Sequence, residues 1–96
     1  MKILIENRVE QAIRHLQQRD VKRVLQKIEL LDQANSNEEI KKFNAKKLPI
    51  PDENLFMLRV TSKLRLIFRY GDREELIIED LISNELLQKL IERRQK

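Results

Sequence analysis

The first third of the chain has the apolar spacing of one strand followed by two helices. Residues 2–5 form a short run rich in β-branched side chains, which predicts a strand. Apolar positions then recur at helical spacing, first at Val9, Ala12, Ile13 and Leu16, and again at Val21, Val24, Leu25, Ile28 and Leu31. Asp20 stands directly before the second series and is predicted to be its N-cap.

The rest of the chain is expected to supply a loop, three strands and a closing helix. Residues 34–54 are interpreted mostly as loop, with one short helical turn in 38–43 before Pro49 and Pro51 impose an extended segment. Three short strands separated by turn-sized gaps follow, at residues 55–60, 64–70 and 75–82. Ser83 or Asn84 would cap a last helix with apolar positions at Leu86, Leu87, Leu90 and Ile91.

This order of elements predicts an α+β fold with one domain over residues 1–96. A chain of 96 residues is long enough for a single core but not for two. The expected order is β-α-α-β-β-β-α. An antiparallel β-sheet would carry the two N-terminal helices on one face, a C-terminal helix would close the chain, and the other face would stay open.

The alternation of apolar and polar residues within 55–70 fixes how the first two of the three predicted strands pair with each other. Side chains alternate between the two faces of a strand, so the apolar positions pair only if residues 61–63 form the turn. Leu58 then faces Leu66, and Arg59 faces Arg65. Like charges directly opposite each other destabilise a sheet by about 0.2–1 kcal/mol, so a compensating partner is expected.

The third strand supplies a candidate for that partner. A three-residue turn at 71–73 would set Arg69 opposite Glu75 and Arg65 opposite Glu79. A two-residue turn would instead place the charged Glu79 opposite an apolar residue and bury its charge. The three-residue turn is therefore preferred. The predicted open face thus carries arginines and glutamates in facing positions.

Two interpretations of this face remain open. In the first, its charges form an exposed ladder of ion pairs, each contributing about 0–1 kcal/mol to stability. In the second, the planar guanidinium groups bind phosphate. The candidate phosphate contacts are Arg59, Arg65, Arg69, Lys46, Lys47 and Lys63.

The composition narrows the chemistry that is expected. Lys and Arg number 20 against 16 Asp and Glu, and the net charge of +4 favours an acidic partner such as RNA, DNA or an acidic protein. The sequence has no Cys and one histidine, His15, so neither a disulfide framework nor a metal site is expected. No apolar run is long enough for a signal segment or a membrane span, so a cytoplasmic protein is predicted.

A family resemblance rests on two segments. Residues 41–48 are rich in lysine, and residues 55–70, LFMLRVTSKLRLIFRY, place one arginine near the end of a strand and another at the start of the next. Together with the N-terminal strand and helix pair, these segments resemble the RelE/ParE superfamily of bacterial toxins. Such toxins are the small basic halves of type II toxin-antitoxin pairs. The resemblance covers nearly the whole chain.

The resemblance implies a concave basic sheet face and a cognate antitoxin protein as partner. In the branch that cleaves messenger RNA, this face holds mRNA on the ribosome, and the ribose 2′-hydroxyl attacks the adjacent phosphate without metal or other cofactor. Arg65 would stabilise the charge that develops on that phosphate, with Arg59 and Arg69 as accessory contacts. Glu79 would be the general base only if substrate reached it, and is equally expected to pair with Arg65.

The sequence departs from the cleaving members after the last predicted strand. Those members usually have a tyrosine, a histidine or both there, whereas residues 81–87 are LISNELL. Two alternatives to a ribosome-dependent mRNA endoribonuclease therefore stay open. One is a non-catalytic, ParE-like inhibitor of DNA gyrase, and the other is an inactive orphan of the toxin fold that binds a partner protein.

Overall fold

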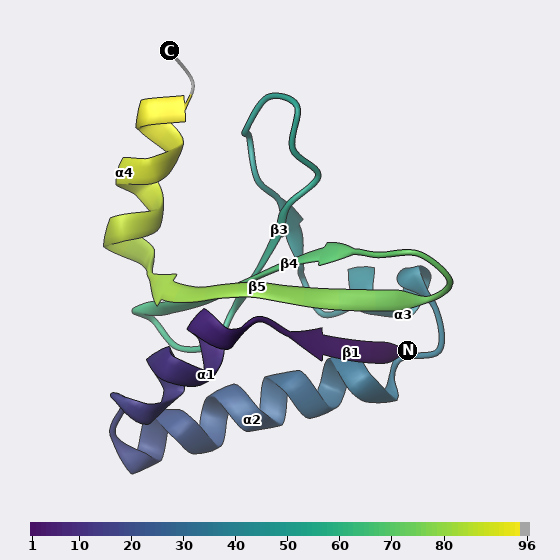
Figure 1. Ribbon diagram of the computed structural model, residues 1–96, viewed down its shortest axis with the longest axis horizontal. Helices are drawn as coiled ribbons and strands as arrows, with labels where there is room; N and C mark the ends of the chain where they lie inside the picture. The colour runs from purple at the N-terminus through teal and green to yellow at the C-terminus, as the bar shows by residue number, and fades with distance from the viewer. Residues whose placement is uncertain (95–96) are drawn as a thin grey trace.

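The computed structural model describes residues 1–94, which form one five-stranded sheet and four helices (Figure 1). The elements in chain order are β1 (Lys2–Ile5), α1 (Asn7–Arg14), α2 (Gln18–Gln33), α3 (Asn37–Lys41), β2 (Lys46–Lys47), β3 (Phe56–Arg59), β4 (Leu64–Tyr70), β5 (Glu75–Ser83) and α4 (Asn84–Arg94). The strands are arranged in the order β1-β5-β4-β3-β2. The predicted α+β class is confirmed, and β2 is a short strand within the segment interpreted as loop.

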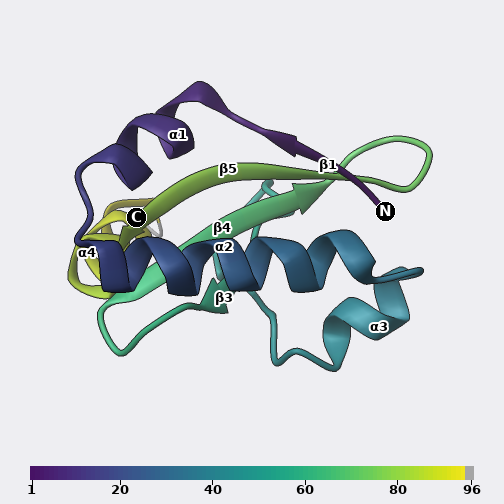
Figure 2. The same ribbon diagram turned by 90° about the horizontal axis from the view of Figure 1, so that it is seen from below.

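The sheet is mixed, which corrects the prediction of a purely antiparallel one. β1 runs parallel to β5, with Lys2 opposite Glu75 and Ile5 opposite Ile78, whereas the other neighbouring strands are antiparallel. A parallel pair needs a long crossover connection rather than a hairpin. The connection from β1 to β5 contains all the elements from α1 to β4. Its first two helices, α1 and α2, pack on one face of the sheet as predicted (Figure 2).

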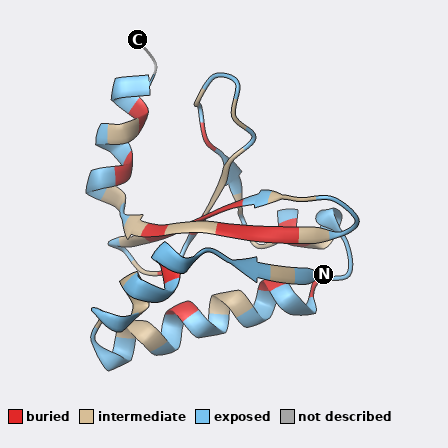
Figure 3. Cartoon of the chain, in the orientation of Figure 1, coloured by how far each residue is buried: buried red, intermediate tan, exposed pale blue. Residues whose placement is uncertain are grey.

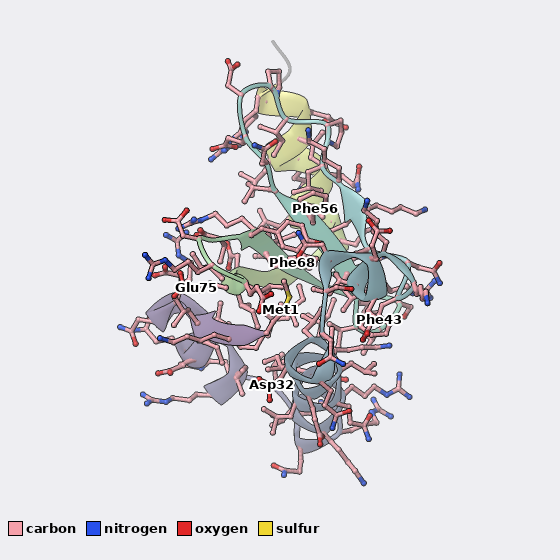
Figure 4. The ribbon with its side chains drawn as sticks, turned by 90° about the vertical axis from the view of Figure 1, so that its right-hand side faces the viewer. Met1, Asp32, Phe43, Phe56, Phe68 and Glu75 are labelled. Atoms are coloured by element: carbon pink, nitrogen blue, oxygen red, sulfur yellow. The ribbon has the colours of Figure 1, made fainter. Side chains whose placement is uncertain are left out.

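The main core lies between the sheet and these two helices. Its fully buried side chains include Leu66, Phe68, Leu76 and Ile78 from the sheet, and Val9, Val24 and Leu31 from the helices. Phe56 stacks on Phe68 with ring centroids 5.7 Å apart, and the two rings lie together on the sheet while Phe43 lies apart (Figure 4). The predicted stripe of α2 is wrong at Leu25, which is 52% exposed, because the buried face of this helix is narrower than the apolar series.

A second, smaller apolar cluster covers part of the opposite face, so the prediction that this face stays open is wrong. The cluster joins β4 to α4 and to the segment after β2, through Leu48, Ile67, Leu87 and Ile91. α4 stands beside the sheet, and its buried residues lie on the side that faces this segment (Figure 3). An ion pair between Arg94 and Glu53 ties the end of the helix to the same segment.

The helix starts differ from the prediction at one position. α2 begins at Gln18 with Gln17 as its N-cap, so Asp20 lies in the first turn. A carboxylate in this turn interacts favourably with the helix dipole. Ser83, one of the two residues predicted to cap the last helix, accepts a hydrogen bond at Oγ from Leu86 N (3.1 Å). The short helix expected in residues 38–43 is α3.

The β3-β4 hairpin has the predicted register. Phe56 faces Phe68, Leu58 faces Leu66, and Arg59 faces Arg65. Val60 N donates to Leu64 O (3.0 Å), which leaves residues 61–63 as the turn. The two arginines therefore occupy facing positions on the side of the sheet away from α1 and α2.

The pairing of β4 with β5 does not have the predicted register. The turn lies at residues 72–74, one residue later than predicted, and Gly71 N donates to Glu75 O (2.9 Å). Tyr70 rather than Phe68 therefore faces Leu76. A β-bulge at Ile67 and Phe68 then shifts the pairing once more, so that Arg65 faces Ile82. Consequently Arg69 does not face Glu75, and Arg65 does not face Glu79.

Candidate functional site

The facing arginines of the hairpin have different surroundings. Arg65 is only 9% exposed, and its Nη1 donates to Thr61 O (2.8 Å) and Leu64 O (3.0 Å). Its Nε is buried and has no hydrogen-bond partner among the described residues. Arg59, in contrast, is exposed. The guanidinium of Arg65 is therefore held against the carbonyls of the hairpin turn, while that of Arg59 is accessible.

A groove of about 620 Å³ lies beside these two arginines and is named the basic groove. Its lining includes Lys27, Phe43, Asn44, Lys46, Arg59 and Arg65. The side chains come from α2, from the turn after α3, and from β2, β3 and β4. β2 is hydrogen-bonded to β3 with Lys46 opposite Met57, which brings this lysine next to the hairpin.

The basic groove contains four cationic side chains and no carboxylate. Among residues 1–94, none of Lys27, Lys46, Arg59 and Arg65 takes part in an ion pair. Cations that are close together and unpaired create a positive potential that attracts anions. Guanidinium and ammonium groups are also the side chains best suited to bind phosphate. The groove is therefore suited to a polyanion.

Lys27 was not predicted as a site residue. It lies on α2 between the buried Val24 and Leu31, is half-buried, and lines the basic groove. The sequence signal that could have identified Lys27 is its position next to the apolar series of α2. Asn44 was also missed, and its φ of 65° marks a left-handed backbone position that Asn tolerates better than most residues.

The predicted site residues are divided among separate places. Lys46, Arg59 and Arg65 line the basic groove, whereas Arg69 and Glu79 form an ion pair in a different cavity of about 390 Å³ beneath α4. Lys63 lines a third cavity, and Lys47 is exposed on β2 opposite Phe56. The predicted pairing of Arg65 with Glu79 is thus wrong, because the shifted turn and the bulge move Glu79 away from Arg65.

Tyr70 lies outside the basic groove, at the end of β4. Its ring makes edge-to-face contacts with Phe56 and Phe68. Burial, and in second place the nearby carboxylate of Glu38, raise the pKa of its phenol. The hydroxyl therefore stays protonated beyond the usual range, in a packing role within the core.

Residues 1–94 contain neither a metal-binding cluster nor a membrane-spanning helix. No group of three or more His, Asp or Glu side chains in this part of the chain is arranged to hold a metal ion. None of the helices described is long and apolar enough to cross a membrane.

Several solved structures share this fold. A chain of the archaeal RelE-RelB complex from Pyrococcus horikoshii is 20% identical, with a TM-score of 0.66 over 85% of this chain and 92% of that one. A YoeB/ParE toxin from Agrobacterium tumefaciens is 15% identical, with a TM-score of 0.61 over 88% and 99%. The isolated RelE toxin of E. coli is also 15% identical, with a TM-score of 0.58 over 96% of both chains.

No protein-family model matches the sequence, and no curated protein matches it. The structural likeness nevertheless extends over most of both chains in each comparison. The chain therefore has the fold of RelE- and ParE-type toxins, which confirms the resemblance stated from its sequence.

Proposed function

We propose that this chain is the toxin of a toxin-antitoxin pair and that its basic groove binds the phosphate backbone of RNA. The fold shared with RelE and YoeB/ParE toxins supports the first part. The archaeal neighbour was solved as a RelE-RelB complex, which supports a cognate antitoxin as partner. The observation that carries the second part is the convergence of four cations without a carboxylate in one groove.

The burial of Arg65 strengthens this argument. A buried charge without an ionic partner has lost water contacts that backbone carbonyls restore only in part. A phosphate in the groove would reduce this cost by bringing negative charge close to the guanidinium. Arg59, Lys46 and Lys27 then make the direct contacts, while Arg65 contributes positive charge from the floor of the groove.

Binding is the core of the proposal, and cleavage is its extension. Metal-independent cleavage of mRNA on the ribosome needs a group that takes a proton from the 2′-hydroxyl. The lining of the basic groove has no carboxylate, imidazole or phenol, and Glu79 is paired with Arg69 in another cavity. In the endoribonuclease version of this function, Arg65 stabilises charge on the phosphate and the proton acceptor comes from outside the groove.

The same lack of proton-transfer groups favours a second candidate, a non-catalytic toxin that inhibits DNA gyrase. Ribosome profiling after induction separates the two. Cuts at the ribosomal A site indicate the endoribonuclease, whereas DNA damage without loss of message indicates the gyrase inhibitor. An induced culture that grows normally indicates an inactive orphan.

RNA binding is tested with purified protein and a fluorescently labelled single-stranded RNA at several salt concentrations. Arg59→Ala is expected to weaken binding and to reduce the slope of log affinity against log salt by about 0.7, the value of one lost phosphate contact. Lys46→Ala is expected to do the same. The control is Arg93→Ala, which removes the same charge from the exposed face of α4. Equal affinities for all three variants would refute the groove as the RNA site.

A further inference from the structure

A second cavity with an excess of positive charge lies beside the same hairpin turn. It measures about 710 Å³ and is formed where the connection between α1 and α2 meets residues 61–64. Its charged and titratable side chains are His15, Arg19, Asp20, Arg23 and Lys63. This cavity is named the junction pocket.

The cations of the junction pocket are exposed and lack ionic partners. Among residues 1–94, Arg19, Arg23 and Lys63 make no ion pair, although Asp20 lines the same cavity. The cavity beneath α4 differs in this respect. Its three arginines are balanced by three carboxylates, and two of the arginines are held in ion pairs. Unbalanced positive charge is therefore a property of the basic groove and the junction pocket, not of every cavity.

Helix α2 joins the two cavities. Arg19, Arg23 and Lys27 are spaced four residues apart, so they lie on one side of the helix, successive residues being about 6 Å apart along its axis. Arg23 lines the junction pocket and Lys27 lines the basic groove. The positive surface is therefore continuous along α2 from one cavity to the other.

This spacing places like charges where they repel one another. Cations four residues apart destabilise a helix, and the facing pair Arg59 and Arg65 adds a repulsion in the sheet. A bound polyanion that follows this surface would offset both. A neutral donor is also available. Among residues 1–94, Ser83 Oγ accepts from Leu86 N and donates to no partner, which leaves its hydroxyl proton free to donate.

We propose that the junction pocket binds a second phosphodiester group of the RNA strand held in the basic groove. The strand passes beside the hairpin turn from one cavity to the other. Arg19, Arg23 and Lys63 contact the phosphate, and His15 and Ser83 add hydrogen bonds. This inference rests on the proposed function and adds to it the path of the RNA and a requirement for length.

The test uses the full chain and a series of labelled oligouridylates of increasing length. A short oligomer fills only the basic groove, whereas a longer one reaches both cavities. Arg23→Ala is expected to leave the affinity for the short oligomer unchanged, to weaken the long one several-fold, and to lower its salt slope by about 0.7. Arg59→Ala should weaken both lengths, and Arg93→Ala should weaken neither. Arg23 is exposed, so its substitution is compatible with folding, which circular dichroism verifies.

The outcomes separate failure of this inference from failure of the proposed function. If Arg59→Ala weakens binding while Arg23→Ala affects no length, the basic groove binds RNA and the junction pocket does not. If the unmodified protein binds none of the oligomers, the proposed function fails. Calorimetry shows whether the phosphates in the two cavities belong to one RNA strand or to two separate strands. Two short strands bound per protein, without a gain for the long strand, would overturn the continuous path.

Discussion

Arg59 and Arg65 face each other across β3 and β4, yet only Arg65 is buried. Its guanidinium is hydrogen-bonded to the carbonyls of Thr61 and Leu64, at the turn of the hairpin. The repulsion expected from two facing arginines is thus relieved in part by backbone carbonyl dipoles, and not by Glu79. As a result, one arginine organises the hairpin turn and the other stays available to a ligand.

Replacement of Arg65 tests its role in the turn. Arg65→Ala is expected to lower the free energy of unfolding by about 1–3 kcal/mol, because the partly buried carbonyl of Thr61 loses its donor. Arg65→Lys should recover only part of this loss, since one ammonium cannot reproduce the fork of a guanidinium. Urea denaturation measures both. Arg59→Ala is the control and should change stability by less than about 0.5 kcal/mol. Equal losses for Arg59→Ala and Arg65→Ala would contradict this assignment.

The ion pair of Arg69 with Glu79 should contribute little to stability. The side chains are 45% and 23% exposed, so solvent screens their attraction. A double-mutant cycle with Arg69→Ala and Glu79→Gln is expected to give a coupling free energy of about 0–1 kcal/mol. The coupling should decrease in high salt. A coupling well above this range, and insensitive to salt, would show that the pair is shielded from solvent.

The β4-β5 turn contains backbone strain that glycine can relieve. Arg73 and Glu74 have φ values of 49° and 63°, in the left-handed region that L residues avoid. Glu74→Gly is expected to raise the free energy of unfolding by about 0.5–1 kcal/mol. Asp72→Gly is the matched control, because Asp72 is not at positive φ and glycine there only adds freedom to the unfolded chain. Thermal unfolding of both variants should show opposite shifts, and a lower midpoint for Glu74→Gly would argue against strain.

Tyr70 should make stability depend on pH in the alkaline range. Its pKa is raised above 10.0 in the folded state by burial and by Glu38, so the unfolded chain loses the phenolic proton first. The contribution is fully present below the unfolded pKa and is lost as the pH rises through the folded one. Unfolding midpoints measured on either side of pH 10 should therefore fall less steeply for Tyr70→Phe than for the unmodified chain. Identical slopes would exclude Tyr70 as the source.

The alternation of apolar and polar residues predicted the β3-β4 register but not the β4-β5 register. In the first hairpin, a shift of one residue would have set Leu58 against Arg65, so the pattern excluded it. In the second, the observed turn shifts the pairing by two residues, from Phe68 opposite Leu76 to Tyr70 opposite Leu76. Between the turn and the bulge, this shift of two leaves every side chain on its own face. The pattern is the same for both registers, and backbone conformation at Arg73 and Glu74 decides between them.

The residues of the candidate site could be predicted from the sequence only where local strand pairing brings them together. Arg59 and Arg65 lie together because the register of their hairpin is encoded locally. Lys46 reaches them through the pairing of β2 with β3, in a segment that was interpreted as loop. Lys27 joins them only through the packing of α2 on the sheet, which involves residues distant in sequence. Arg69 and Glu79 belong to another cavity because of the bulge and the position of α4. Tertiary packing of this kind leaves little trace in the spacing of residue types.

The parallel pairing of β1 with β5 also determines the order in which the sheet can assemble. Lys2 faces Glu75, so this contact closes a loop of most of the chain, whereas residues 61–63 close the first hairpin. The entropic cost of the longer closure is greater by about 3 kcal/mol. We therefore expect β3, β4 and β5 to associate first and β1 to join last. During synthesis, β1 leaves the ribosome before the other strands of the sheet and must wait for β5 before it finds its neighbour.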